Sequence, residues 1–296
     1  MGRYVRTAPP HPRRRPPERN ITTQVEPPPA PPAEKRRTKR ERRVTAINIA
    51  RRKNAAEPFA VMTAYDAAFA RCAEQAGIDV LLVGDSVGTV VLGYDSTVPV
   101  TLDDMIHHTA AVARGAKHAH IIGDMPFGSY QTSDAEAVRA ASRLIQEGSA
   151  TSVKLEGGVR SADRIRAIVG AGIPVMGHIG VLPQTAGLGP GFKVRTNRER
   201  LLGDARAVQD AGAYAIVLEV VSAELAAEIT RELKIPTIGI GSGPACDGQV
   251  LVLYDMLGLF EDPPSFVKRY AEFGAQAVRA LEQFASDVAA RKYPPQ

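Results

Sequence analysis

The sequence predicts an α/β protein folded as a (β/α)8 barrel, also called a TIM barrel, with a basic, proline-rich N-terminal extension. Short apolar runs recur between residues 59 and 255, and stretches with the pattern of amphipathic helices separate most of them. Strands that alternate with helices in this way form a parallel sheet covered on its outer face. The length of 296 residues also suits one such barrel, since these typically need about 250 residues.

The N-terminal segment, residues 1–44, has a composition unlike the rest of the chain. It holds 13 Lys and Arg against 4 Asp and Glu, and 10 of the 22 prolines. Such a segment buries too little apolar surface to fold. We therefore expect a disordered extension at 1–44 and a catalytic barrel domain at 45–296. An arm that binds nucleic acid and a merely solvated extension both remain open; the second is favoured because aromatic side chains do not alternate with the basic ones.

Eight apolar runs are predicted as strands, and helical patterns separate most of them. SDAEAVRAASRLIQEG, for instance, has Ser133 or Asp134 as a helix N-cap and Gly148 beyond its end. The predicted strands, in chain order, are FAVMTAYD (59–66), VLLVGDS (80–86), HIIGDMPF (120–127), SVKLEGG (152–158), PVMGHIG (174–180), AIVLEVV (215–221), PTIGIGSG (236–243) and QVLVLYD (249–255).

An open, doubly wound sheet is the alternative topology for this alternating pattern. It would be expected to carry a GxGxxG or GxxxxGK[ST] phosphate loop, and the sequence has neither after its first strand. The nearest string, GIGSG at 239–243, is more typical of a tight turn than of a phosphate site. The barrel is therefore the favoured architecture.

Composition excludes several other classes of protein. No apolar run approaches the roughly 18 residues of a membrane-spanning helix, and the N-terminus has no apolar signal region. Two cysteines, Cys72 and Cys246, cannot form a disulfide framework. We expect a cytoplasmic protein without a membrane partner.

Charged side chains stand at the ends of the predicted strands. In a parallel barrel all carboxyl-terminal strand ends face one way, so these residues converge at one mouth. Lys154 precedes Glu156 by two residues, which places both on the same side of their strand. Acids crowded together away from water need a cation to share. The strand-end residues are Asp85, Asp124, Glu156, His178 and Glu219.

The expected cation is Mg²⁺. The candidate ligands are carboxylate oxygens, and the sequence has no HxxxH or CxxC pair that would favour Zn²⁺. Asp85 and Asp124 are the expected ligands, with Glu156 behind them. For each aspartate a structural role stays open: Asp85 could cap the following turn, and Asp124 could pair with a nearby Lys or Arg.

The remaining strand-end residues suggest acid-base chemistry. Lys154 could form a Schiff base, but the neighbouring acids favour a protonated lysine that grips a substrate carboxylate. Glu219, within an apolar strand, suits a base that removes a proton next to a carbonyl, although a salt bridge to an arginine is equally open. The role of His178, structural or catalytic, also stays open. Together the residues favour class II aldolase-like enolate chemistry.

At this level of detail the chain resembles the ketopantoate hydroxymethyltransferase family, over about residues 45–295. The strings that carry the resemblance occur in order and at matching spacing. They are TAYD (63–66), LLVGDSVG (81–88), GYDSTVPVTLDDM (93–105), DMPFGSY (124–130), VKLEGG (153–158), PVMGHIGVLPQ (174–184), IPTIGIGSG (235–243) and CDGQVLV (246–252).

The resemblance implies a cytoplasmic, homodecameric barrel enzyme of pantothenate and coenzyme A biosynthesis. Its reaction transfers a hydroxymethyl group from 5,10-methylenetetrahydrofolate to 3-methyl-2-oxobutanoate and gives 2-dehydropantoate. The resemblance also implies roles for matching positions. Asp85, Asp124 and Glu156 would hold Mg²⁺, Glu219 would accept the proton, and the 2-oxo acid would contact Asp85, Ser86, Asp124 and Lys154.

Three differences from the family pattern and one alternative function accompany this interpretation. The basic tail has no counterpart in the family's core. Arg195 and Thr196 replace a Gln-Gly pair in the loop 189–200, which we expect to act as a lid, and Ser222 replaces a proline. The alternative is a Mg²⁺-dependent enzyme of the phosphoenolpyruvate mutase and isocitrate lyase type. Its lyase members carry a KKCGH-type loop that this sequence lacks. No nucleic-acid partner is expected.

Overall fold

The computed structural model describes residues 43–53, 55, 58–188 and 193–295. The expected extension at 1–44 therefore lies almost wholly outside the described residues, and its disorder and its boundary at residue 44 stay predictions. Arg43 and Val44, which are described, already contact the barrel: Arg43 Nη2 donates to Ala116 O at 3.0 Å, and Val44 N–H donates to His118 O at 2.8 Å.

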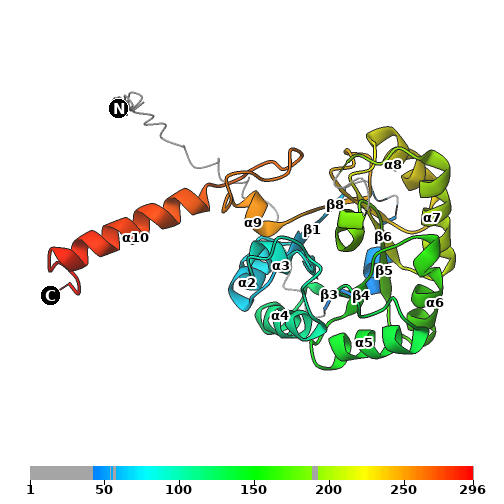
Figure 1. Ribbon diagram of the computed structural model, residues 1–296, viewed down its shortest axis with the longest axis horizontal. Coiled ribbons are helices and arrows are strands. Elements are labelled where there is room, and N and C mark those ends of the chain that lie inside the picture. The colour runs from blue at the N-terminus through cyan, green and yellow to red at the C-terminus, as the bar shows by residue number, and fades with distance from the viewer. Residues whose placement is uncertain (1–42, 54, 56–57, 189–192, 296) are drawn as a thin grey trace, which may run out of the picture. The chain divides into compact units, whose positions relative to one another are not determined.

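Eight parallel strands form a closed barrel in chain order, as the sequence predicts (Figure 1). The barrel closes where β1 pairs with β8, with Phe59 opposite Gly248 and Met62 opposite Leu251. Closure excludes the open-sheet alternative. The strands are β1 (Phe59–Thr63), β2 (Val80–Val83), β3 (His120–Asp124), β4 (Ser152–Lys154), β5 (Val175–Gly180), β6 (Ala215–Glu219), β7 (Thr237–Ile240) and β8 (Gly248–Leu251).

Helices follow the strands, and side-chain caps fix where several of them begin. Ser133, not Asp134, caps α5 by accepting a hydrogen bond from Glu136 N–H. The helices are α1 (Ala46–Ala50), α2 (Ala67–Gln75), α3 (Val87–Val90), α4 (Leu102–Gly115), α5 (Asp134–Gln146), α6 (Ala162–Gly170), α7 (Arg198–Asp210), α8 (Ala223–Glu232), α9 (Leu253–Met256) and α10 (Phe273–Ala289), with 3-10 turns η1 (Val159–Ser161) and η2 (Pro183–Leu188).

Most strands end earlier than the apolar pattern suggests. β2 ends at Val83, before Gly84, and β4 ends at Lys154, so Glu156 lies two residues beyond its strand. Residues 253–255, predicted as strand, instead begin helix α9. Beyond the end of β4 the backbone still bonds to β5: Leu155 N–H donates to Met176 O at 3.3 Å and Gly157 N–H donates to His178 O at 2.9 Å. Glu156 lies between these two contacts.

Strand side chains alternate between two apolar layers. Leu81 and Val83 pack with the residues of the surrounding helices, whereas Val80 and Leu82 belong to the cluster inside the barrel. Ile49 of α1 joins the inner cluster. The interior is therefore filled by side chains, and a site can open only at the strand ends.

No helix among the described residues is long and apolar enough to span a membrane. Helix α10 differs from the other long helices because none of its residues is buried. Its large apolar side chains, including Leu281 at 67% and Phe284 at 52% exposure, face solvent in the single chain.

Candidate functional site

The first part of the site joins the carboxyl ends of β2, β3 and β4. Asp124, the last residue of β3, lies directly opposite Lys154, the last residue of β4. Its Oδ1 is 2.8 Å from Lys154 Nζ, and both side chains are at most 5% exposed. Asp85 N–H donates to Asp124 Oδ2 at 3.1 Å. The structure thus brings together Asp85, Asp124 and Lys154, as expected. Asp124 also pairs with a lysine, which is the structural role left open for it in the sequence analysis.

His178 connects this group to Glu156 and Glu219. Its Nδ1 lies 3.4 Å from Lys154 Nζ and 3.7 Å from Glu156 Oε1, and its Nε2 lies 3.2 Å from Glu219 Oε2. The arginine partner considered for Glu219 is replaced by this histidine. Glu219 is also less buried than its apolar strand suggests, with a side chain that is 15% exposed. His178 therefore lies between the acids of the site.

The site holds more carboxyl groups than cationic groups, and burial shifts the pKa of several of them. Burial raises the pKa of Asp124 to about 7, against the lowering effect of Lys154, and Asp85 adds to the rise. Burial, together with Asp85, also holds the pKa of Glu156 well above its usual range. For Lys154 the neighbouring carboxylates outweigh burial and raise its pKa, so it stays an ammonium. Burial lowers the pKa of His178, which favours the neutral imidazole.

Residue types and orphaned atoms at this site fit a hard divalent cation. Glu156 Oε1 is buried and accepts no hydrogen bond within the described part of the chain. Among all described residues of the chain, no group of three or more His, Cys, Asp or Glu is arranged to hold a metal ion. Mg²⁺ needs only one or two protein carboxylates, because water and substrate oxygens complete its shell. Asp85 and Asp124 can supply these two, and whether Glu156 also ligates stays a prediction.

Sequence reasoning missed Gln184, which holds the site from the loop after β5. Its buried amide Nε2 donates to Asp85 Oδ2 and to Met125 O, both at 3.0 Å. Its Oε1 accepts from Tyr130 OH at 2.7 Å. The sequence gives only a weak signal for this role, an amide side chain shortly after a predicted strand end. The path of the loop that brings Gln184 to Asp85 depends on the tertiary structure.

Tyr130 and Tyr65 are two further residues of the site that carry no sequence assignment. Tyr130 OH also lies 3.2 Å from Glu156 O, and Tyr65 OH lies 2.8 Å from Ser86 Oγ. Burial raises the pKa of both tyrosines, so each stays a neutral phenol. Ser86, expected to contact the substrate, is thereby fixed beside Asp85.

Backbone geometry places Glu219 at the mouth. Gly180, with φ of 103°, lies opposite Glu219 across the β5–β6 pair, and a Cβ at Gly180 would lie 2.2 Å from Glu219 O. Val220, the next residue, has a φ of 51°, which is unusual for a β-branched residue. Its N–H donates to Ile240 O and its carbonyl accepts from Arg195 N–H, both at 2.8 Å. Strain held in place next to a polar side chain is typical of functional sites.

Comparison with known proteins identifies the family of this chain. The model of the ketopantoate hydroxymethyltransferase family matches residues 43–296. A 3-methyl-2-oxobutanoate hydroxymethyltransferase of Carboxydothermus hydrogenoformans is 51% identical, over 85% of this chain and 93% of that protein. The enzyme of the same name from Chloroflexus aurantiacus is 54% identical, over 85% and 91% of the two chains.

Solved structures with a similar fold are more distant in sequence. The 2,3-dimethylmalate lyase, a PEP mutase/isocitrate lyase superfamily member, is 20% identical with a TM-score of 0.55, over 86% of this chain and 90% of that one. Phosphonopyruvate hydrolase in complex with oxalate and Mg²⁺ is 14% identical with a TM-score of 0.56, over 84% and 88%. At these identities the likeness shows a shared fold.

Proposed function

Because this chain belongs to the ketopantoate hydroxymethyltransferase family, we propose that it transfers a hydroxymethyl group to 3-methyl-2-oxobutanoate. The co-substrate is 5,10-methylenetetrahydrofolate and the product is 2-dehydropantoate, a precursor of pantothenate and coenzyme A. The observation that carries the proposal is the contact between the Asp85–Asp124–Lys154 group and Glu219 through His178. Through this contact, Lys154 as the cationic group and Glu219 as the carboxylate base lie at the same mouth of the barrel.

Lys154 and Asp85 orient the 2-oxo acid. The Lys154 ammonium, kept charged by Asp124, binds the substrate carboxylate, and Ser86 contributes a hydroxyl beside it. Asp85 and Asp124 would hold Mg²⁺, with Glu156 adjoining. When bound, Mg²⁺ supplies a Lewis acid that stabilises negative charge developing on the keto oxygen of the substrate.

Glu219 removes the proton from C3 of the substrate. Its Oε2 lies 3.2 Å from Nε2 of His178, whose pKa burial lowers, so the base adjoins a neutral ring. The resulting enolate carbon forms a bond to the methylene carbon of the folate, and a water oxygen forms the second new bond to that carbon. Both of its bonds to the folate nitrogens break, and the nitrogens take up the proton removed from C3 and one proton of the water.

Exchange of the C3 proton tests the first half of this reaction without any folate. 3-Methyl-2-oxobutanoate is incubated with the enzyme in D₂O, and loss of the C3 proton signal is followed by NMR. Wild-type enzyme should exchange the proton in a Mg²⁺-dependent way. Glu219→Gln should slow exchange by about 100-fold or more, and Asp124→Ala should abolish the metal dependence.

Glu224→Gln is the matched control, since Glu224 is an exposed acid of α8. It should exchange at the wild-type rate. Exchange at the wild-type rate in Glu219→Gln would contradict the role of Glu219 as the base. Wild-type exchange that does not depend on Mg²⁺ would contradict the proposed role of the metal. Failure of the folded wild type to exchange, even with folate present, would contradict the proposed function.

We further propose a homodecamer in the cytoplasm. The uncovered apolar side chains of α10 support an oligomer, because a helix of this kind is stabilised when a second subunit covers it. The alternative, a lyase or mutase of the PEP mutase and isocitrate lyase type, is supported by fold alone. A folate-independent cleavage or rearrangement of a 2-oxo acid would favour it.

A further inference from the structure

Three hydroxyl groups, the hydroxyl chain of Thr63, Tyr65 and Ser86, lead from helix α9 to the site. Thr63 is the last residue of β1 and Tyr65 follows it by two residues; both are buried. Leu253 N–H, at the start of α9, donates to Thr63 Oγ1 at 2.9 Å. The Thr63 hydroxyl hydrogen-bonds to Tyr65, whose own OH lies 2.8 Å from Ser86 Oγ. Ser86 directly follows Asp85, so the hydroxyl chain ends at the site.

The direction of the hydrogen bonds in the hydroxyl chain follows from its first contact. A backbone N–H can only donate, so Thr63 Oγ1 accepts from Leu253 and the proton of the threonine hydroxyl is left for Tyr65. The phenol then accepts from Thr63 and gives its own proton to Ser86 Oγ. Burial raises the pKa of Tyr65, so the phenol keeps the proton that it donates. The proton of the Ser86 hydroxyl is thereby left for a group in the site.

Ser86 does not have the role that a serine usually has at the start of a helix. It is the N-cap residue of α3, but its side chain accepts no capping hydrogen bond from the residues of that helix, all of which the structure describes. A Cβ at Gly84 would lie 2.8 Å from Ser86 Oγ and 3.9 Å from Asp124 Oδ2. The hydroxyl and the carboxylate therefore lie on the same side of Gly84, and the hydroxyl is turned towards the acids of the site.

Tyr65 is itself held by two further contacts. His108 Nδ1, from α4, lies 2.7 Å from Tyr65 O, and because a carbonyl oxygen only accepts, Nδ1 carries the proton. The ring of Tyr254, in α9, packs edge-on against the Tyr65 ring, with centroids 5.6 Å apart. The phenol therefore cannot turn away from Ser86 without the loss of packing contacts.

We infer that Tyr65 is a positioning residue that presents Ser86 as a hydrogen-bond donor to the carboxylate of the 2-oxo acid. The inference rests on the proposed function, in which Lys154 and Ser86 bind that carboxylate. An unconstrained serine hydroxyl rotates among several partners, whereas the hydroxyl chain sets its direction before the substrate arrives and so lowers the ordering cost of binding. Because this contact lies at the carboxylate and not at C3, Tyr65 should affect substrate affinity and not the rate of proton removal.

The test measures two quantities on the full-length enzyme with Mg²⁺. Calorimetry gives the dissociation constant of 3-methyl-2-oxobutanoate, and NMR gives the rate of C3 proton exchange at saturating substrate. Tyr65→Phe keeps the ring and removes only the hydroxyl; it should weaken binding by about three- to tenfold and keep the exchange rate within about twofold. Ser86→Ala should weaken binding at least as much. Adding Tyr65→Phe to Ser86→Ala should cause no further loss, because the phenol acts through the serine.

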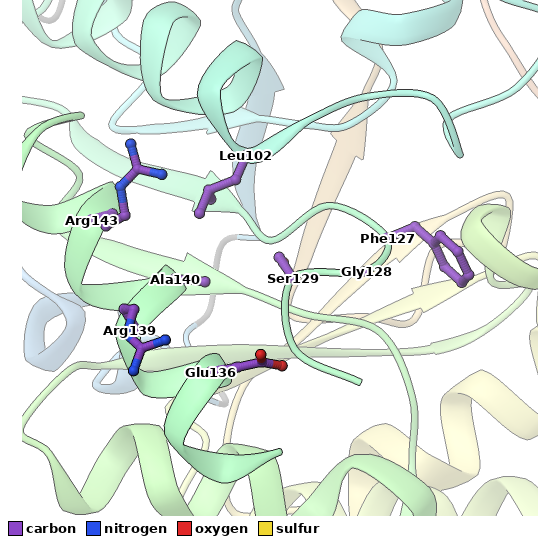
Figure 2. Close-up of a pocket in the computed structure, with 8 residues that line it drawn as sticks. All are labelled: Leu102, Phe127, Gly128, Ser129, Glu136, Arg139, Ala140 and Arg143. Atoms are coloured by element: carbon purple, nitrogen blue, oxygen red, sulfur yellow. The ribbon is translucent and has the colours of Figure 1, made fainter. Parts of the chain in front are cut away.

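Two matched controls separate the hydroxyl chain from general packing. Tyr254→Phe makes the same chemical change in the ring that packs against Tyr65. Ser129→Ala repeats the change of Ser86→Ala outside the hydroxyl chain. Ser129 lines a cavity of about 420 Å³ along α5 (Figure 2), and its Oγ donates to Pro126 O at 2.7 Å. Both control variants should bind the 2-oxo acid and exchange its proton as the wild type does.

Thr63→Val provides an independent variant, since it interrupts the hydroxyl chain one step earlier with a side chain of the same shape. It should also weaken binding, by about twofold or more. Wild-type affinity in both Tyr65→Phe and Thr63→Val would overturn the inference. So would slower exchange at unchanged affinity in Tyr65→Phe, an additive loss in the Ser86→Ala background, or an equal loss in Tyr254→Phe.

The same measurements distinguish this inference from the proposed function. A folded wild type that neither binds 3-methyl-2-oxobutanoate nor exchanges its C3 proton overturns the proposed function, and the role of Tyr65 with it. A wild type that binds and exchanges, beside Tyr65→Phe and Thr63→Val variants with the same affinity, overturns only the role of Tyr65.

Discussion

Gln184 links the loop after β5 to Asp85 and to the loop after β3, because its buried amide bonds to Asp85 Oδ2, Met125 O and Tyr130 OH. Its Nε2 donates to Asp85 Oδ2 and so helps to fix the orientation of that carboxylate. Side chains that hold a ligand in this way tune a metal site strongly. The residue thus determines how Asp85 is presented.

Replacing Gln184 by leucine should therefore impair metal use. We expect the Mg²⁺ concentration for half-maximal C3 proton exchange to rise by about 10- to 100-fold, because Asp85 Oδ2 loses its donor. Tyr130→Phe removes the hydroxyl that donates to Gln184 Oε1 and should have a smaller effect in the same direction. A Gln184→Leu enzyme with wild-type Mg²⁺ dependence would contradict this role.

His120 lies at the opposite end of the barrel and provides a test of pH dependence away from the site. Its ring is fully buried, with Nε2 2.8 Å from Ser152 Oγ and 3.2 Å from Tyr214 OH, and Nδ1 3.2 Å from Val44 O. Burial lowers its pKa from 6.5 to about 4; the Val44 carbonyl opposes this shift and Arg43 adds to it.

Since the folded state disfavours protonated His120, its contribution to stability is complete above pH 6.5 and is lost as the pH falls from 6.5 towards 4. Between pH 8 and pH 5 the loss should be about 2 kcal/mol. Urea unfolding of wild type and His120→Gln at both pH values gives the difference. The variant should lose less stability on acidification than the wild type by about this amount. Equal losses would show that His120 does not titrate in this way.

At the scale of elements, close packing of α4 against the start of α2 depends on Gly115. A Cβ at this position would lie 2.4 Å from Ala67 O and 2.6 Å from Ala67 Cα. These are backbone atoms, which cannot move aside as the end of a flexible side chain can. The last residue of α6, Gly170, faces open space instead, with nothing within 4 Å of a Cβ.

The two glycines form a matched pair of helix-terminal substitutions. Gly115→Ala should lower the free energy of unfolding by about 1–3 kcal/mol, through overpacking. Gly170→Ala should leave stability unchanged or raise it by up to about 1 kcal/mol. Both are measured by urea denaturation. A neutral Gly115→Ala would mean that α2 and α4 can separate without cost.

At the scale of the whole molecule, α10 is the element that a single chain does not bury. Its apolar stripe includes Val278, Leu281, Phe284 and Val288, all between 48% and 67% exposed. Such a stripe on a long amphipathic helix suits contact with another subunit.

Leu281→Asp with Phe284→Asp should therefore reduce the proposed decamer to smaller species, because two charges would enter an apolar interface. Arg279→Asp on the opposite side of the helix is the control and should keep the wild-type mass. Light scattering coupled to gel filtration measures both. A double variant with the mass of the wild type would exclude this helix from the interface.

The sequence predicted the parts of the molecule that depend on local patterns. Apolar runs separated by helical segments indicate the eight strands, and parallel strands bring their polar ends to one side. Asp85, Asp124, Lys154 and Glu219 could therefore be chosen before any contact was known. The family strings supported the same positions, and the family itself is confirmed.

Only the tertiary structure decided how these residues meet. It placed His178 between Lys154 and Glu219, returned Gln184 to Asp85, and ended β4 two residues before Glu156. Strand order follows from periodicity along the chain, whereas a hydrogen bond between residues 99 positions apart depends on loop paths and on the packing of many side chains at once.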